Sequence, residues 1–155
     1  MYGSVVAEQS GASEDEAARP LFENSHTAAI AKVINVEKRV RGVRVTHVWG
    51  ETKAFAEKAA AAGDIPNIVE RPEDLVGQVD AAAVDHRHGK YHLPAAEALL
   101  EAKMPLFIDK PFCYRKAEGQ LFLARAKKLN VPVCSFSTLP KQASYKAFAK
   151  KLKQL

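Results

Sequence analysis

The sequence predicts an α/β domain built on a doubly wound, mostly parallel sheet, and three observations predict it. Short apolar runs that fit strands alternate with segments of helical period along most of the chain. The clearest unit lies at 104–138, where an apolar strand, a charged tripeptide, a long helical pattern and a second apolar run follow one another. Polar and charged side chains come directly after the apolar runs. Open α/β sheets bind ligands beyond the carboxyl ends of their strands, so we expect the functional residues at that edge.

The strands are predicted from apolar runs and their punctuation. Residues 43–49 alternate between apolar and polar side chains and end at Gly50. Residues 106–108 form a short continuous apolar run between Pro105 and Pro111, which is typical of a strand covered on both faces. The predicted strands are 43–49, 65–69, 79–84, 106–108 and 131–136.

The helices are predicted from apolar side chains that recur near every 3.6 residues. Ser25 or Asn24 can cap the first helix, and Gly63 closes the second. In the last, Lys127 and Lys128 lie in the final turn, where the helix dipole favours cations, and Asn130 suits the C-terminal cap. The predicted helices are 26–34, 52–62, 91–102 and 117–129, with a brief helical turn at 72–76.

The length of 155 residues favours one domain, for which we expect three parts. Residues 1–20 carry Ser, Gly, Ala and four acids without sustained period and are predicted to be flexible. Residues 21–140 form the folded domain. Residues 141–155 form a basic amphipathic helix, with an apolar stripe opposite its lysines.

The sequence leaves two candidates for the first strand of the sheet. Rossmann domains begin with a strand that leads into G-x-G-x-x-G, and no such motif precedes Ser25. Leu21-Phe22 is the preferred first strand, and Ser4 to Ala7 is the alternative. Such glycines let a pyrophosphate approach the backbone, so their absence argues against tight binding of a dinucleotide. A strand from residues 1–24 in the centre of the sheet would support a formed cofactor cleft.

Composition excludes several classes of function. Hydrophobic residues make up 47% of the chain, but no apolar run approaches the roughly 20 residues of a membrane span. The tail holds five lysines and no acid, so 18 basic and 18 acidic side chains remain in 1–140. The basic excess thus belongs to one terminal helix, which disfavours a nucleic-acid partner. Two cysteines without metal-like spacing and no leader-like start indicate a reducing, cytoplasmic setting.

Residues 98–111, together with His92 and with 131–138, resemble the nucleotide-binding domain of the Gfo/Idh/MocA oxidoreductases, the glucose-fructose oxidoreductase and inositol dehydrogenase family. The resemblance implies a Rossmann fold with NAD or NADP as cofactor and a sugar-like or polyol alcohol as substrate. In that family a Glu-Lys-Pro tripeptide ends the fifth strand, with its Lys beside nicotinamide and substrate and its Pro often preceded by a cis bond. Asp109 replaces that Glu here.

The family also has a second domain that normally supplies most of the substrate pocket. The resemblance therefore implies that this chain lacks a complete active site by itself. The alternative is a non-catalytic Rossmann module for binding or regulation, with a degenerate glycine loop.

Lys110 is the predicted catalytic residue. An ammonium at a strand end can orient a substrate oxygen and assist proton transfer; otherwise Lys110 is a surface lysine paired with Asp109. Ten residues in all are predicted to form the site. The nine predicted to contact the cofactor are Ser25, His26, Trp49, Glu51, Asp85, His88, His92, Asp109 and Pro111.

These nine come from placement rules and from the resemblance. Ser25-His26 matches a Ser-His at the first helix of some family members. Glu51 lies near the position that reads the adenosine ribose, and Trp49 either stacks on adenine or plugs the sheet edge. The cluster 85–92 is predicted to contact the nicotinamide ribose, while His92 could instead make a local hydrogen bond. A metal site is not predicted, because the H-x-H of this cluster lacks a third ligand.

The predicted partners are few. We expect a small sugar-like substrate, no nucleic acid and no membrane. The amphipathic tail could serve a homo-oligomer or another partner, or pack on its own sheet.

Overall fold

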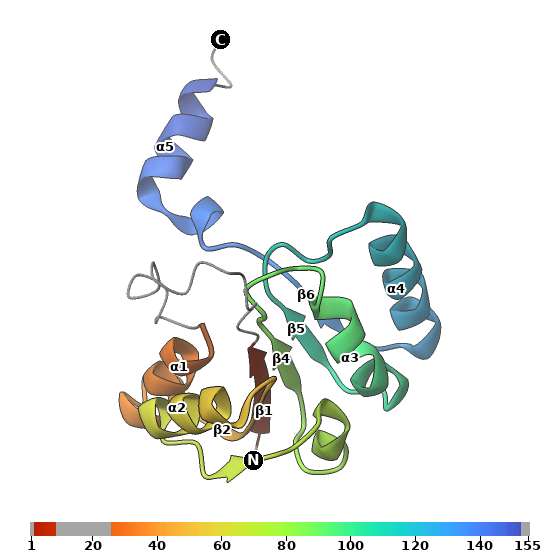
Figure 1. The fold of residues 1–155 in the computed structure, drawn as a ribbon. Coiled ribbons are helices and arrows are strands. Elements are labelled where there is room, and N and C mark those ends of the chain that lie inside the picture. Colours follow the sequence, from red (N-terminus) through yellow and green to blue (C-terminus); the bar gives the residue numbers. More distant parts are fainter. Residues whose placement is uncertain (1, 9–25, 153–155) are drawn as a thin grey trace, which may run out of the picture.

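The computed structural model of the protein describes residues 2–8 and 26–152. Its centre is a six-stranded parallel sheet with the order β3-β2-β1-β4-β5-β6 (Figure 1). The strand order reverses between β1 and β4, which is the switch point of a doubly wound sheet and confirms the predicted fold class. The strands are β1 Tyr2–Glu8, β2 Val43–Gly50, β3 Asn67–Ile68, β4 Ala82–Val84, β5 Leu106–Ile108 and β6 Val133–Cys134.

The preferred position of the first strand is wrong. β1 is formed by residues 2–8, which include the alternative segment Ser4 to Ala7, and it lies in the centre of the sheet between β2 and β4. The prediction of a flexible segment is therefore also wrong for these residues, while Leu21-Phe22 lies outside the described residues. Val5-Val6-Ala7 is a sufficient apolar run for a strand paired on both sides, but the acids that follow it obscured the pattern.

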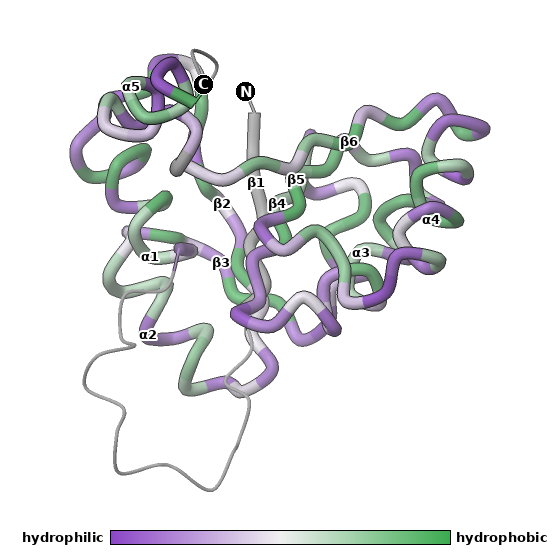
Figure 2. The backbone as a smooth tube through the Cα atoms, turned by 90° about the horizontal axis from the view of Figure 1, so that it is seen from above, coloured by the Kyte–Doolittle hydropathy of each residue, from purple (hydrophilic) through white to green (hydrophobic). Residues whose placement is uncertain are grey.

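Two helical layers cover the two faces of the sheet. Figures 1 and 2 show α1 and α2 on one side, and α3 and α4 on the other. The helices are α1 His26–Ala31, α2 Lys53–Gly63, α3 His92–Glu101, α4 Lys116–Leu129 and α5 Ala143–Leu152. Shorter helical segments are η2 Lys32–Val36, η3 Pro72–Leu75 and η4 Leu139–Lys141.

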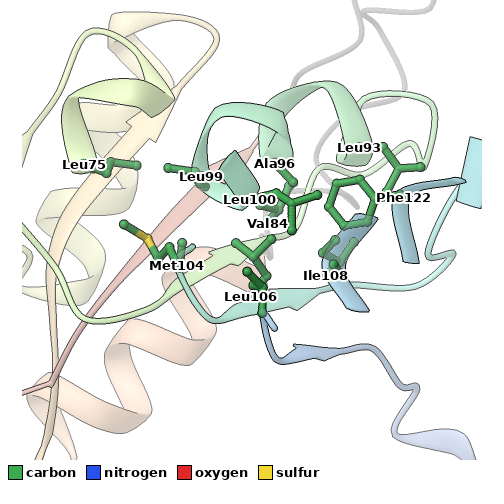
Figure 3. Packing of buried hydrophobic residues seen from close by; sticks show 13 residues of the cluster. Leu75, Val84, Leu93, Ala96, Leu99, Leu100, Met104, Leu106, Ile108 and Phe122 are labelled. Atoms are coloured by element: carbon green, nitrogen blue, oxygen red, sulfur yellow. The ribbon is translucent and has the colours of Figure 1, made fainter. Parts of the chain in front are cut away.

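Each layer has its own apolar core. The smaller core joins α1, α2 and β2 and centres on Ala31, Val45 and Val48. The larger one packs η3, α3 and α4 on β4 and β5, with Leu100 and Ile108 fully buried (Figure 3). Burial of these side chains holds the ends of β4 and β5 in fixed positions.

Some element boundaries differ from the prediction and others agree with it. β6 is shorter than predicted because its one neighbour, β5, has three residues, so pairing stops there. The first helix continues as the π-helical segment η2. Asn130 adopts the left-handed conformation as the C-cap of α4, as predicted.

The tail is helical over α5, and residues 153–155 lie outside the described part of the chain. None of the residues of α5 is buried, and Figure 1 shows it extending away from the sheet. Within the described residues, no helix has the length and apolar character needed to cross a bilayer.

Candidate functional site at the ends of β4 and β5

The Asp109-Lys110-Pro111 segment emerges at the carboxyl edge of the sheet, as predicted. The N–H of Asp109 donates to the carbonyl of Val84 at 2.9 Å, which continues the pairing of β4 and β5 by one residue. Asp109 is 8% exposed, whereas Lys110 is exposed. The Lys110–Pro111 peptide bond is cis, as the resemblance implied.

His26 reaches this segment from the first residue of α1. Its Nδ1 atom contacts a carboxylate oxygen of Asp109, and its ring is about half exposed. The contact spans 83 positions of the sequence. The two residues that were predicted separately as cofactor ligands thus bind each other.

His92 reaches the same segment from the first residue of α3. The ring is fully buried, with Nδ1 at 2.9 Å from the carbonyl of Pro111 and Nε2 at 2.6 Å from the carbonyl of His86. Both ring nitrogens therefore face backbone oxygens of the protein. The structure shows the local hydrogen bonding that was the alternative to direct cofactor contact.

Asp85 lies directly after β4 and is 4% exposed. Its two carboxylate oxygens lie 3.0 and 2.9 Å from the hydroxyl of Thr27, which donates to them from the second residue of α1. Thr27 was not among the predicted site residues. The sequence shows a hydroxyl residue directly after His26 in the first helical turn. It does not show that this hydroxyl is buried against Asp85, so Thr27 could not be identified.

His86 belongs to the predicted polar cluster 85–92 but was not among the ten predicted site residues. It is 1% exposed, and its Nδ1 has no hydrogen-bond partner among the residues that the structure describes. Burial, and secondarily the charge of neighbouring His92, lowers the pKa of His86 to about 4, so the ring is neutral at pH 7. A buried polar atom without a hydrogen-bond partner is uncommon in folded proteins and carries an energetic cost.

Trp49 brings the end of β2 to the same cluster. Its ring centre lies 5.8 Å from that of His86, and its indole N–H donates to the carbonyl of Glu70 at 2.9 Å. The ring is therefore held in place by the backbone near β3. Glu51 is exposed in the loop between β2 and α2 and is not brought to the cluster.

His88 points to a different place. It is exposed, its Nδ1 accepts from the N–H of Lys90 at 3.2 Å, and its ring lies 5.6 Å from that of Tyr114. With Tyr91 and Phe122 it lines an open groove of about 1130 Å³ along α3 and α4. Lys110 does not line this groove.

An ion pair between α3 and α4 contributes to the lining of that groove, through Glu97 and Arg125. The guanidinium of Arg125 on α4 binds Glu97 and Glu101 of α3, and these hydrogen bonds raise the pKa of Arg125.

Ser25, predicted as a cofactor ligand, lies outside the described residues. No group of three or more metal-ligating side chains occurs in the ranges that the structure describes.

The doubly wound parallel sheet, whose strand order reverses between β1 and β4, defines the class: an α/β domain of the type that binds ligands at the carboxyl edge of its strands. Residues 10–136 match the GFO_IDH_MocA family, described as an oxidoreductase family with an NAD-binding Rossmann fold. The chain belongs to the Gfo/Idh/MocA family. Its matched region is the NAD-binding domain, which confirms the predicted cofactor class.

Solved structures share the fold at low sequence identity. An oxidoreductase from Agrobacterium radiobacter in complex with NAD+, L-tartaric acid and magnesium aligns with a TM-score of 0.73 and 11% identity, over 99% of this chain and 40% of its own. Biliverdin reductase from Synechocystis sp. PCC 6803, in complex with biliverdin and NADP+, gives 0.70 and 16%, over 97% and 42%. Scyllo-inositol dehydrogenase from Lactobacillus casei with NAD(H) and scyllo-inositol gives 0.66 and 14%, over 99% and 42%.

The chain spans about two-fifths of the length of these solved relatives. A search of curated proteins gives no match. The structural likeness therefore supports the fold, and the family match supports the class of cofactor.

Proposed function

We propose that this chain is the nucleotide-binding part of an oxidoreductase that transfers hydride between NAD or NADP and an alcohol carbon of a sugar-like or polyol substrate. Lys110 is the proposed catalytic residue. The observation that carries the proposal is the contrast within the tripeptide. Asp109 and Pro111 are bound by the protein, while the ammonium of Lys110 has no hydrogen bond or ion pair with another described residue.

The residues at the strand ends fit a dinucleotide. Trp49 at the end of β2 and exposed Glu51 in the loop after it offer an aromatic ring and a carboxylate to the adenosine part of a dinucleotide. We propose that Trp49 and Glu51 contact the adenosine end of the cofactor at the carboxyl edge of β2, while Lys110 faces the substrate. When bound, the nicotinamide supplies the hydride acceptor or donor.

Lys110 would act on the oxygen of the substrate. An alcohol that loses hydride from carbon must also release the proton on its oxygen to solvent, and negative charge develops on that oxygen as the proton leaves. An ammonium within hydrogen-bond reach of the oxygen stabilises this charge and fixes its orientation. We infer that a further domain is needed to enclose the substrate, in keeping with the resemblance.

Fluorescence titration with NADH and NADPH tests the first part of the proposal. We expect saturable binding of one or both below millimolar concentration. Absence of binding up to millimolar cofactor would favour a non-catalytic module, the alternative that the missing glycine motif suggests.

Turnover tests the role of Lys110. The assay uses this chain together with the domain that encloses the substrate, under conditions where it reduces NAD or NADP with a polyol. There, Lys110→Met should lower kcat by about 10²-fold or more, while Lys110→Arg retains part of the activity. Both variants should bind NADH within a few-fold of the native affinity. Unchanged kcat in Lys110→Met would exclude Lys110 from the reaction.

A further inference from the structure

The segment that carries Lys110 is held from both faces of the sheet by histidines. His26 belongs to α1 in one helical layer, and His92 belongs to α3 in the other (Figure 1). Each is the first residue of its helix. Both helix starts thus lie at the carboxyl edge, where the tripeptide emerges.

The two histidines hold different parts of the segment. His26 binds the side chain of Asp109, one residue before Lys110, and His92 binds the backbone carbonyl of Pro111, one residue after it. The N–H of Asp109 is fixed separately by β4. The residues on both sides of Lys110 are therefore fixed, whereas its own side chain stays exposed.

Packing in the neighbouring loop adds to this restraint. A Cβ atom built on buried Gly89 would come within 2.8 Å of both the ring and the carbonyl oxygen of Pro111. The loop between β4 and α3 therefore lies directly against the tripeptide. His92 ties the same loop to the tripeptide, because its second ring nitrogen lies at the carbonyl of His86.

We propose that His26 and His92 are positioning residues that together clamp the Asp109–Pro111 segment and so set the place of the Lys110 ammonium. The inference rests on the proposed function, in which Lys110 orients the reacting oxygen. A misplacement of about 1 Å in such a group can cost about 10²-fold in rate, which is why a clamp on both sides has a purpose. The pairing of His26 with Asp109 also links α1 to the lysine.

Backbone mobility in the cofactor-free protein tests the clamp directly. ¹⁵N relaxation of the Asp109 and Lys110 amides should show greater mobility in His26→Ala than in the native protein. His26→Gln, whose amide can still donate to Asp109, should restore the native values. His47→Ala is the matched control, because His47 lies on β2 and bonds to Thr46 instead.

His26 decides the test because its ring is half exposed, so its removal leaves the cores intact. His92→Gln is measured alongside where its thermal unfolding curve shows a folded protein. A double-mutant cycle of His26→Ala and Asp109→Asn adds a second readout: the mobility of the Lys110 amide should rise in either single variant and rise no further in the double variant.

Asp109 and Lys110 amides that stay as rigid in His26→Ala as in the native protein would overturn the clamp. This outcome is separate from failure of the proposed function. A native protein that binds no NADH fails the function test, whereas the relaxation measurement needs no cofactor.

Discussion

At the scale of single residues, the site consists mainly of polar side chains that are hydrogen-bonded within the protein. Two polar groups, the ammonium of Lys110 and the Nδ1 of His86, have no such partner among the described residues. Asp85 and Asp109 are buried carboxylates satisfied by Thr27 and His26. Lys110 is exposed, and the Nδ1 of His86 has no hydrogen-bond partner within 2–8 and 26–152. The paired groups fix the geometry, and the exposed ammonium of Lys110 is left for a ligand.

The hydroxyl of Thr27 should contribute measurably to stability. Thr27→Val keeps the shape of the side chain but removes the donor to the buried carboxylate of Asp85, so we expect a loss of about 1–3 kcal/mol in the free energy of unfolding. Urea unfolding at pH 7 measures it. Thr27→Ser retains the hydroxyl and should lose clearly less; equal losses would show that the methyl packing, rather than the hydrogen bond, matters.

His86 predicts a dependence of stability on pH. Its pKa is about 4 in the folded chain, below its ordinary value of 6.5, so between these values the unfolded chain binds more protons. The stabilising contribution of neutral His86 to the free energy of unfolding is therefore complete above pH 6.5. It falls as the pH is lowered and is lost below pH 4. The total is about 3 kcal/mol.

Unfolding at pH 7 and at pH 5 measures this effect. His86→Leu should show a smaller loss of stability between the two pH values than the native protein. Exposed His88→Ala, the control, should keep the native difference. An identical difference in native protein and His86→Leu would mean that other groups cause the pH dependence.

The sequence predicted those parts of the site that local pattern determines. Asp109 and Lys110 follow a continuous apolar run between prolines, which located them at a strand end. The partners of Asp109 and Asp85 could not be found, because they come from residues 83 and 58 positions away. His92 was placed at a helix start, but its contacts depend on how two loops meet.

At the scale of elements, the crossing of α1 and α2 depends on a missing side chain. A Cβ atom built on Gly63 would lie 2.4 Å from the Cβ of Ala31, so the two helices meet there without room for another atom. Asn35 in η2 also donates to the carbonyls of Gly63 and Asp64 at 2.9 and 3.0 Å. The end of α2 is thus held against α1 and η2 by close packing and hydrogen bonds.

Gly63→Ala should therefore destabilise the protein, although alanine is the better helix former. We expect a loss of about 1–3 kcal/mol from overpacking. The double variant Ala31→Gly/Gly63→Ala removes the clashing atom and should recover part of the loss. The single variant Ala31→Gly measures what a glycine costs in α1 by itself. Thermal unfolding of the three variants gives these values, and a Gly63→Ala protein of native stability would show that the helices separate at little cost.

The same scale explains how far the fold was predictable. The strands 43–49 and 106–108 and the helix 117–129 were predicted closely, because each has a clear period and marked ends. The central strand β1 was misplaced, because its two valines lie in a segment of mixed composition and its pairing with β2 and β4 is a property of the whole sheet. Tertiary pairing overrode the local pattern.

At the scale of the whole molecule, α5 stands apart from the rest. Tyr145, Phe148 and Leu152 on α5 are 40%, 59% and 52% exposed, and no residue of this helix is buried. Burial of apolar area is the main source of folding free energy, so an exposed helix contributes little to it. Partner binding through this helix stays a prediction.

Removal of residues 143–155 should therefore leave the domain folded with nearly its native stability. We expect the midpoint of thermal unfolding to change by less than about 2 °C, because both apolar cores lie within residues 31–133. A matched shortening that also removes β6 deletes paired backbone at the sheet edge and should lower the midpoint clearly. A large drop on loss of α5 alone would show that its apolar stripe is covered in solution, by the domain itself or by a second copy, and size-exclusion chromatography of the two proteins would separate these causes.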